Sequence, residues 1–259
     1  MATFLFDKIV FGPVISRRLG VSLGINLLPP DKKWCSFNCI YCECGWTSPA
    51  PYYSEGFPPR ELVRKELEKR LAQMLENNQK PDTITFAGNG EPTLHPRFAG
   101  IIDDTVLLRD KLAPEASIAV LSNGTMLDDP SVFTALEKVD QNILKIDSAI
   151  EETLRLLNQP GEDFSLGKLV DNIMRFNGRF VLQTLFVRGY YKGVRVDNAS
   201  ERELQEWLKL VERVSPQMVM VYTIARDTPA VGLSRVPRDE LQVIAAKVEE
   251  LGIPVQISS

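Results

Sequence analysis

The chain has 259 residues, of which 44% are hydrophobic and 25% charged, and its formal net charge is -4. This composition is typical of a globular protein with a sizeable core, and it argues against intrinsic disorder. The length suits one α/β barrel, so we expect a single domain over residues 1–259. The acidic balance lacks the basic excess of a general phosphate-backbone binder.

The first residues carry no targeting signal that we can identify. Asp7 and Lys8 interrupt the apolar stretch that a signal peptide would need, and no small-residue cleavage site follows. No stretch approaches the roughly 18 consecutive apolar residues of a membrane helix. We therefore expect a cytoplasmic protein that does not enter a membrane.

Short apolar segments alternate with amphipathic ones along the chain. After an N-terminal extension over 1–20, we predict strands at 21–28, 83–88, 117–122, 142–147, 179–187, 217–224 and 253–258. We predict helices at 60–75, 97–112, 131–138, 199–214 and 237–252. In the first helix the apolar face is expected to hold Leu62, Val63, Leu67, Leu71, Met74 and Leu75.

This alternation predicts the α/β class, with parallel strands covered by helices. We expect a barrel core over 21–224, followed by a helix and an extra strand over 225–259. In such folds the chemistry gathers in loops after the carboxyl ends of strands. Three polar or glycine-rich loops, at 35–45, 88–96 and 122–125, are therefore expected on one rim.

All four cysteines lie in one loop, at Cys35, Cys39, Cys42 and Cys44. In a reducing compartment such a cluster indicates metal ligands or redox groups before disulfides. Zinc sites usually combine two pairs from separated segments, whereas here one loop supplies every sulfur and the only histidine is His95. An iron-sulfur cluster suits the spacing better, and zinc remains the alternative.

Cys35-x3-Cys39-x2-Cys42, with Tyr41 before the last cysteine, resembles the signature of the radical S-adenosylmethionine (SAM) superfamily. GNGEP at 88–92 resembles that superfamily's GGE loop. The flanking FGPVISRRLGVSLGINLLP and IYC resemble iron-sulfur oxidoreductases related to wyosine-forming tRNA enzymes. The resemblance implies a partial (βα)6 barrel with an N-terminal strand extension and a C-terminal extra strand.

The resemblance also implies the cofactors. Cys35, Cys39 and Cys42 would hold three irons of a 4Fe-4S cluster, and SAM would chelate the fourth iron. Reductive cleavage of SAM would then give a 5'-deoxyadenosyl radical that abstracts hydrogen from the substrate. An electron donor such as flavodoxin or ferredoxin is implied as a partner. Cys44 lies outside this set, and its role is open.

The GNGEP loop is expected to bind SAM through Gly88, Asn89, Gly90 and Glu91. The two glycines would approach the ligand closely and adopt positive φ, and Glu91 would accept a hydrogen bond from the methionine amino group. A plain turn between strand and helix is the alternative reading.

Further cofactor contacts are expected from the neighbouring loops. Ser122 and Asn123 are candidates for the methionine or ribose, although Asn-Gly is also a good turn. Lys145 and Asp147 share one strand face and are candidates for the SAM carboxylate and ribose, with a mutual salt bridge as the alternative.

Other polar residues carry weaker expectations. Arg17 and Arg18 either favour an anionic substrate group or form a solvated surface pair. His95 is expected to serve a turn or cap more readily than acid-base catalysis. Core or rim positions are expected for Gln183, Thr184, Tyr222, Arg226 and Asp227.

The wyosine relatives hold a second cluster through cysteines ahead of the motif, and this chain has no cysteine before Cys35. We therefore do not expect this chain to catalyse the reaction of the wyosine-forming enzymes. We expect a single-cluster radical SAM enzyme that acts on a small molecule or nucleoside, with tRNA possible. The alternatives are an activase that installs a glycyl radical on a partner enzyme, and a non-enzymatic metal-binding protein.

Overall fold

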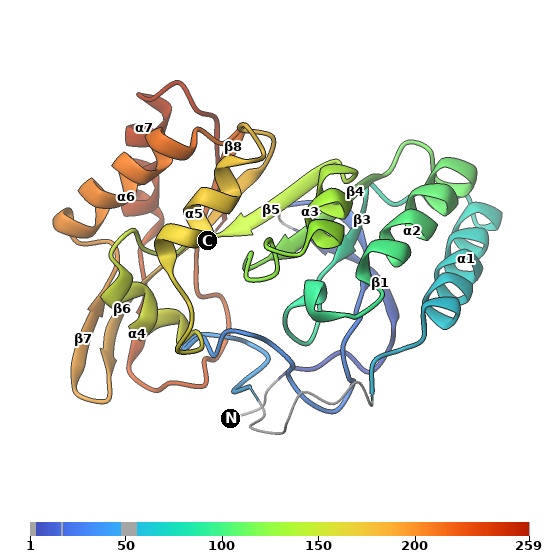
Figure 1. The fold of residues 1–259 in the computed structure, drawn as a ribbon, viewed down its shortest axis with the longest axis horizontal. Coiled ribbons are helices and arrows are strands. Elements are labelled where there is room, and N and C mark those ends of the chain that lie inside the picture. The colour runs from blue at the N-terminus through green and yellow to red at the C-terminus, as the bar shows by residue number, and fades with distance from the viewer. Residues whose placement is uncertain (1–3, 17, 48–55, 259) are drawn as a thin grey trace.

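The computed structural model describes residues 4–16, 18–47 and 56–258, so Arg17 lies outside the described residues. Within these ranges one curled sheet has the strand order β1-β2-β3-β4-β5-β6-β8-β10 (Figure 1). The strands are β1 (Val10–Ser16), β2 (Gly20–Ile25), β3 (Thr83–Phe86), β4 (Ser117–Ser122), β5 (Gln141–Lys145), β6 (Val181–Tyr191), β8 (Met218–Thr223) and β10 (Val255–Ser258).

In this order each strand from β2 to β10 pairs in parallel with the next, whereas β1 pairs antiparallel with β2. Six strand-helix units therefore form a partial barrel, with β1 as the N-terminal strand extension and β10 as the extra C-terminal strand. This confirms the predicted fold class. Because the strands are parallel, their carboxyl ends and the following loops meet at one rim.

Helices cover the outer face of the sheet, and Figure 1 shows α1, α2, α3, α5, α6 and α7 following one another around the molecule. Their bounds are α1 (Arg60–Glu76), α2 (Phe98–Leu112), α3 (Pro130–Glu137), α4 (Glu151–Asn158), α5 (Leu166–Met174), α6 (Glu201–Val214) and α7 (Arg238–Glu249), and a 3-10 turn, η1, spans Pro92–Leu94.

Helix α1 buries a narrower stripe than predicted. Val63, Leu67, Leu71 and Met74 are buried, and they recur at spacings of three and four residues along one side of the helix. The structure exposes the other two apolar residues assigned to this face, which flank the stripe: Leu62 and Leu75.

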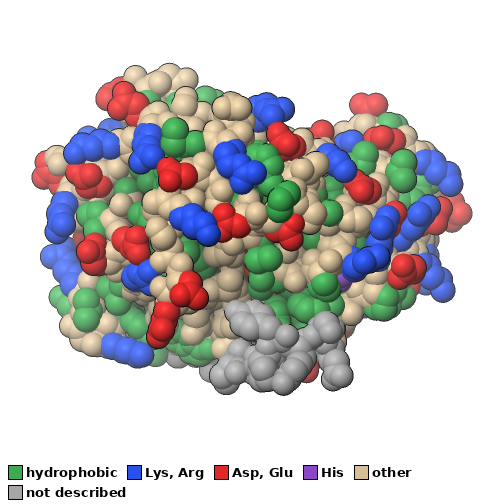
Figure 2. Space-filling view, viewed as in Figure 1, with side chains coloured by type: hydrophobic (Ala, Val, Ile, Leu, Met, Phe, Trp, Pro, Cys, Tyr) green, Lys and Arg blue, Asp and Glu red, His purple; other side chains and the backbone are tan. Residues whose placement is uncertain are grey.

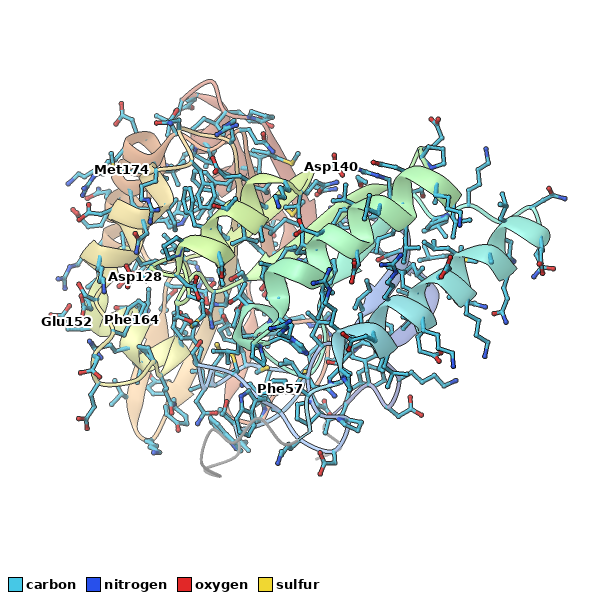
Figure 3. All side chains as sticks on the ribbon, turned by 45° about the vertical axis from the view of Figure 1, so that its right-hand side comes forward. Phe57, Asp128, Asp140, Glu152, Phe164 and Met174 are labelled. Atoms are coloured by element: carbon cyan, nitrogen blue, oxygen red, sulfur yellow. The ribbon has the colours of Figure 1, made fainter. Side chains whose placement is uncertain are left out.

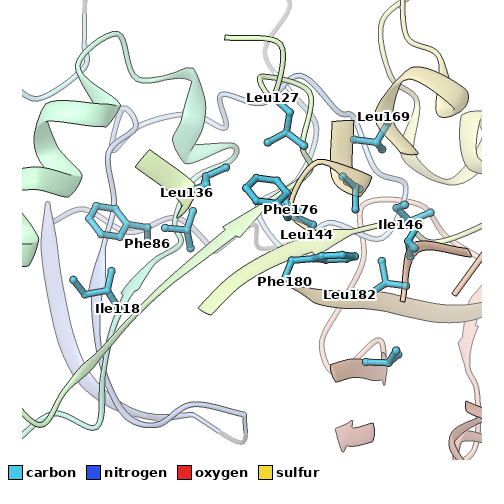
Figure 4. Packing of buried hydrophobic residues seen from close by; sticks show 14 of the residues in the cluster. Phe86, Ile118, Leu127, Leu136, Leu144, Ile146, Leu169, Phe176, Phe180 and Leu182 are labelled. Carbon is cyan, nitrogen blue, oxygen red and sulfur yellow. The ribbon is translucent and has the colours of Figure 1, made fainter. Parts of the chain in front are cut away.

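The main hydrophobic core fills the space between sheet and helices. Figure 4 shows part of it, including Leu144 of β5, Leu182 of β6, Leu136 of α3, Leu169 of α5 and Phe176, which follows α5. A small separate cluster lies on the opposite face of the strands, since Ala119 alternates along β4 with Ile118 and Val120 of the main core. Its buried members are Leu19, Ala119, Ile143, Val181 and Met220.

Strand β2 is shorter than the predicted 21–28. It ends at Ile25 because the next side chain, Asn26, bonds to local backbone: its Oδ1 accepts from Leu28 N at 3.2 Å and its Nδ2 donates to Leu28 O at 3.0 Å. This Asx-type arrangement turns the chain before the two prolines.

Four elements were not predicted. The helices α4 and α5 lie between β5 and β6, and β6 runs on to Tyr191 to form an antiparallel extension with β7 (Val194–Asp197) and β9 (Leu233–Arg235).

Figure 2 shows acidic and basic side chains interspersed over one face of the molecule. Among the described helices, none combines the length and hydrophobicity that crossing a bilayer requires.

Candidate functional site: a cysteine-lined cavity at the barrel mouth

The three loops predicted to share a rim line one cavity of about 570 Å³. Its lining includes most of the predicted site residues: Cys35, Cys39, Tyr41, Cys42, Gly88, Gly90, Glu91, Ser122, Asn123 and Lys145. Asn89 and Asp147 are not part of the lining and lie buried behind it.

Each cysteine of the three-residue set receives an N–H group. The Phe37 backbone N–H points at Cys35 Sγ at 3.4 Å, and Asn158 Nδ2 points at Cys39 Sγ at the same distance. The Lys33 ammonium lies close to Cys42 and lowers the pKa of its thiol. Hydrogen bonds to sulfur are typical surroundings of cysteine-ligated iron-sulfur clusters, so these residues fit a cluster.

Cys44 lies beside Cys42 in the same cavity, with its thiol donating to Gly88 O at 3.4 Å. The adjacent Cys44 and the nearby Lys33 charge lower the pKa of Cys42 to about 5, whereas the adjacent Cys42 and burial raise the pKa of Cys44. Cys44 is therefore the protonated partner. Within the described ranges, no three Cys, His, Asp or Glu side chains are grouped as ligands of a single metal ion.

Lys33 is a buried cation at the cysteine loop that the sequence reading missed. Its side chain donates to Gly45 O at 3.1 Å. Burial lowers the pKa of Lys33, but the cysteine sulfurs, Cys42 foremost, more than offset this, so that the net shift is upward. A cation here offsets the negative charge that three thiolates bring to the loop.

Asp147 is the centre of a buried polar network behind the cavity. Its Oδ2 accepts from Tyr41 Oη, from Lys145 Nζ and, at 2.7 Å, from Asn158 Nδ2. Its Oδ1 accepts from the Leu185 backbone at 3.0 Å. The mutual salt bridge of Lys145 and Asp147, named above as the alternative, is thus present, while Lys145 still lines the cavity.

Tyr41 is fixed by this network. Burial, and then the nearby Asp147 charge, raise the pKa of Tyr41, so its hydroxyl stays protonated and donates. Because Tyr41 precedes Cys42 directly, the bond to Asp147 ties the cysteine loop to the end of β5.

Glu91 begins the η1 turn after β3 and is almost fully buried. Its Oε1 accepts from Thr93 N–H, Thr93 hydroxyl and Ser122 hydroxyl, and its Oε2 accepts from Asn123 N–H at 2.7 Å. Burial raises the pKa of Glu91 although these hydrogen bonds oppose the shift. Oε2 keeps a free lone pair beside the cavity.

The two glycines of this loop, Gly88 and Gly90, allow it to pack closely against neighbouring segments of the same chain. A Cβ on Gly90, which has φ +139°, would meet Trp34 O at 1.9 Å. One on Gly88 would meet Asn26 Oδ1 at 2.3 Å, and Gly88 does not adopt the predicted positive φ. The close approach is therefore to the chain's own segments. The side chain of Asn89 is buried and bonds to the backbone of Phe6 and Pro29, and Asn89 is not part of the cavity lining.

Ser122 and Asn123 line the cavity, and their side chains form hydrogen bonds with other residues of the chain. The Ser122 hydroxyl donates to Glu91, and Asn123 Nδ2 donates to Ser36 Oγ at 2.9 Å. Asn123 Oδ1 accepts from Thr125. Ser122 therefore joins the end of β4 to the GNGEP loop, and Asn123 joins it to the cysteine loop.

His95 has the structural role expected of it. Its Nδ1 accepts from Arg97 N–H at 3.0 Å, which leaves Nε2 to donate to Pro58 O at 2.9 Å. Burial lowers the pKa of His95. Phe57, labelled in Figure 3, packs edge-on against His95 and Trp34.

The later strands divide their polar residues between core and cavity. Thr184 bonds to Ile146 O and Trp207 Nε1 and is a satisfied core residue. Gln183, Tyr222 and Arg226 line the cavity, and Arg226 Nη1 pairs with Glu43 Oε2 at 2.8 Å.

A family model described as the radical SAM superfamily matches residues 32–175, more than half of the chain. A UPF0026 protein of Methanocaldococcus jannaschii is 34% identical over 183 residues, which are 69% of this chain and 54% of that protein. A protein named GTPase Obg from Brachyspira hyodysenteriae is 33% identical over 233 residues, 86% of this chain and 31% of that protein. The chain thus spans less than two thirds of the length of these relatives.

Solved structures share the fold. A radical SAM methyltransferase from Sphaerobacter thermophilus matches with a TM-score of 0.66 at 14% identity, over 92% of this chain and 65% of that chain. Archaeal TYW1 matches with a TM-score of 0.56 at 14% identity, over 88% of this chain and 71% of that chain. With the cysteine spacing and the family match, the conclusion is that this chain belongs to the radical SAM superfamily, whose cofactors are a 4Fe-4S cluster and SAM.

Proposed function

We propose that this protein is a radical SAM enzyme that holds one 4Fe-4S cluster through Cys35, Cys39 and Cys42. One observation supports this above all: the three thiols and Glu91 line a single cavity at the carboxyl ends of parallel strands. Family membership supports an enzyme over a non-enzymatic metal-binding protein.

The chain supplies the electrostatic setting for the cluster. Soft thiolates are the preferred ligands of iron-sulfur clusters. Hydrogen bonds from Phe37 N–H and Asn158 Nδ2, with the buried charge of Lys33, stabilise negative charge on the sulfurs. These donors also hold the loop in one conformation for cluster assembly.

SAM is assigned to the side of the cavity formed by the loops after β3 and β4. The Glu91 carboxylate, with a free lone pair on Oε2, suits the methionine ammonium. When bound, the two cofactors supply a reductive cleavage of SAM that yields a 5'-deoxyadenosyl radical for hydrogen abstraction. Apolar lining from Phe37, Leu121 and Leu185 excludes water from that space.

The substrate is proposed to be a small molecule or a nucleoside, including a nucleoside in tRNA. The cavity of about 570 Å³ is within the usual range of small-molecule sites. A one-electron reductant such as flavodoxin or ferredoxin is the proposed protein partner, because the reaction consumes an electron that the chain does not itself provide.

Anaerobic reconstitution with iron and sulfide tests the proposal. We expect a 4Fe-4S absorption and EPR spectrum, and formation of 5'-deoxyadenosine when dithionite and SAM are added. A protein that assembles the cluster but forms no 5'-deoxyadenosine, or that binds zinc without assembling a cluster, contradicts it.

A further inference from the structure

Among the described residues, six charged side chains line the cavity. They are Arg18, Lys33, Glu43, Glu91, Lys145 and Arg226. Five have a partner described above: Lys33 at Gly45 O, Glu91 at its four donors, Lys145 at Asp147, and the rim pair of Glu43 with Arg226. Arg18 is the exception.

The Nη1 atom of Arg18 is buried, and no acceptor in the described part of the chain lies within hydrogen-bond distance of it. The guanidinium lies over the Tyr222 ring, with Cζ 4.8 Å from the ring centroid. This cation–π contact holds the group beside the ring but provides no acceptor for its Nη1 hydrogens. A buried guanidinium donor without an acceptor costs free energy, so it indicates a ligand.

A second buried polar atom without a partner lies next to the same ring. Ser258 Oγ has no hydrogen bond among the described residues, and Ser258 also lines the cavity. In the register of β10 with β8, Ser258 stands beside Tyr222. Gln256 Nε2 donates to Arg18 O at 3.1 Å, which holds the β1–β2 turn against β10. Arg18 and Ser258 therefore flank Tyr222 from two segments.

We propose that Arg18 and Ser258 form a subsite for an oxyanion of the substrate, a carboxylate or a phosphate. A guanidinium fork with an adjacent hydroxyl donor is suited to such a group. The inference rests on the proposed function, because it assigns the substrate class of that enzyme. We assign the anion to the substrate and not to SAM because of the strands involved. Glu91 follows β3 and Ser122 ends β4, whereas Tyr222 and Ser258 lie on β8 and β10.

The test measures binding of inorganic phosphate and of acetate to the reconstituted protein with SAM present, by ³¹P line broadening and by ¹H saturation transfer. We expect one or both anions to bind the wild type in the millimolar range, and Arg18→Gln to weaken that binding about tenfold. Ser258→Ala should weaken anion binding about threefold. If Arg18→Gln does not fold, the Ser258→Ala result alone tests the subsite. Arg213→Gln, which makes the same charge change on the exposed face of α6, is the control.

Phosphate binding alone assigns a phosphate, acetate binding alone a carboxylate, and either result supports the subsite. Absence of binding, or binding that survives both variants, overturns it. A tenfold loss of SAM affinity in Arg18→Gln also overturns it, because the anion would then be the SAM carboxylate. None of these readouts needs SAM cleavage, so failure of the subsite and failure of the proposed enzyme activity are distinguishable.

Discussion

Asn158 donates its side-chain amide to Cys39 Sγ at 3.4 Å, although the two residues are 119 positions apart. The same Nδ2 lies 2.7 Å from Asp147 Oδ2 and 3.1 Å from Tyr41 Oη. One fully buried carboxamide at the end of α4 thus positions the cysteine loop against β5.

The Asn158 contact predicts an effect on the cluster's reduction potential. Asn158→Ala removes an N–H group that stabilises the more negative, reduced state, so the potential should fall. A loss of about 1 kcal/mol of hydrogen bonding corresponds to about 40 mV for one electron. EPR-monitored redox titration measures it, with Asn172→Ala, an exposed Asn that bonds to Asp128, as the control. An unchanged or higher potential contradicts the assignment.

Glu91→Gln should weaken SAM binding at least about tenfold while the cluster still assembles, because the substitution removes the charge opposite the methionine ammonium. Titration calorimetry on the reconstituted protein measures the affinity. Thr93→Val is the matched control: it deletes one hydrogen bond to Glu91 Oε1 from a residue outside the cavity lining. Equal SAM affinity in Glu91→Gln and the wild type would remove Glu91 from the cofactor site.

Gly90→Ala should destabilise the fold by about 2–4 kcal/mol, because a Cβ would lie 1.9 Å from Trp34 O in a backbone conformation with φ +139°. Urea unfolding of the cluster-free protein measures the loss. Gly161→Ala is the control, since nothing lies within 4 Å of its Cβ. If both variants unfold at the same urea concentration, the close approach of the two loops is wrong.

The ion pair between α1 and α2 predicts a pH dependence. Arg60 bonds Asp104 through two nitrogens, and these hydrogen bonds hold the pKa of Asp104 below its ordinary value of 3.8. The stabilisation is therefore present above 3.8 and is lost as the pH falls through the native pKa.

Arg60→Gln should accordingly cost about 1 kcal/mol at neutral pH, a value limited by solvent screening of the half-exposed arginine. The deficit should shrink as Asp104 is protonated. Lys111→Gln, which breaks the exposed pair with Glu68, is the control between the same helices and should cost roughly 0.3 kcal/mol. Thermal melts at several pH values measure both, and a constant Arg60 deficit down to strongly acid pH would contradict the account.

Most of the barrel was predictable because its strands are buried on both faces and are read as short apolar runs. The helices α4 and α5 were missed. Helix α3 is as short as α4 but was predicted, because Asp129 and Pro130 mark its start, whereas α4 follows Ile150 and has no capping side chain. The hairpin β6–β7 was missed too, although Lys192 and Gly193, both at positive φ, mark its turn.

Some residues of the candidate site were likewise predictable from the sequence, and others were not. The cysteine spacing, Glu91 and the Ser122 loop were predictable because each lies in a local motif after a strand. Asn158 could not be predicted, because nothing in its own segment indicates a partner 119 residues away. Asn89 was assigned to the cofactor from its place in the GNGEP motif, whereas its side chain bonds to Phe6 and Pro29.

The division of the four cysteines is the central claim, and single alanine substitutions test it most directly. Each variant is reconstituted anaerobically, and its EPR spectrum and its 5'-deoxyadenosine yield are recorded together. Cys35→Ala, Cys39→Ala and Cys42→Ala should each lose SAM cleavage. Cys44→Ala should keep the cluster and most of the cleavage, since Cys44 lies outside the three-cysteine spacing and its thiol donates to Gly88 O. Loss of the cluster in Cys44→Ala, with retention in any of the other three variants, would contradict the account.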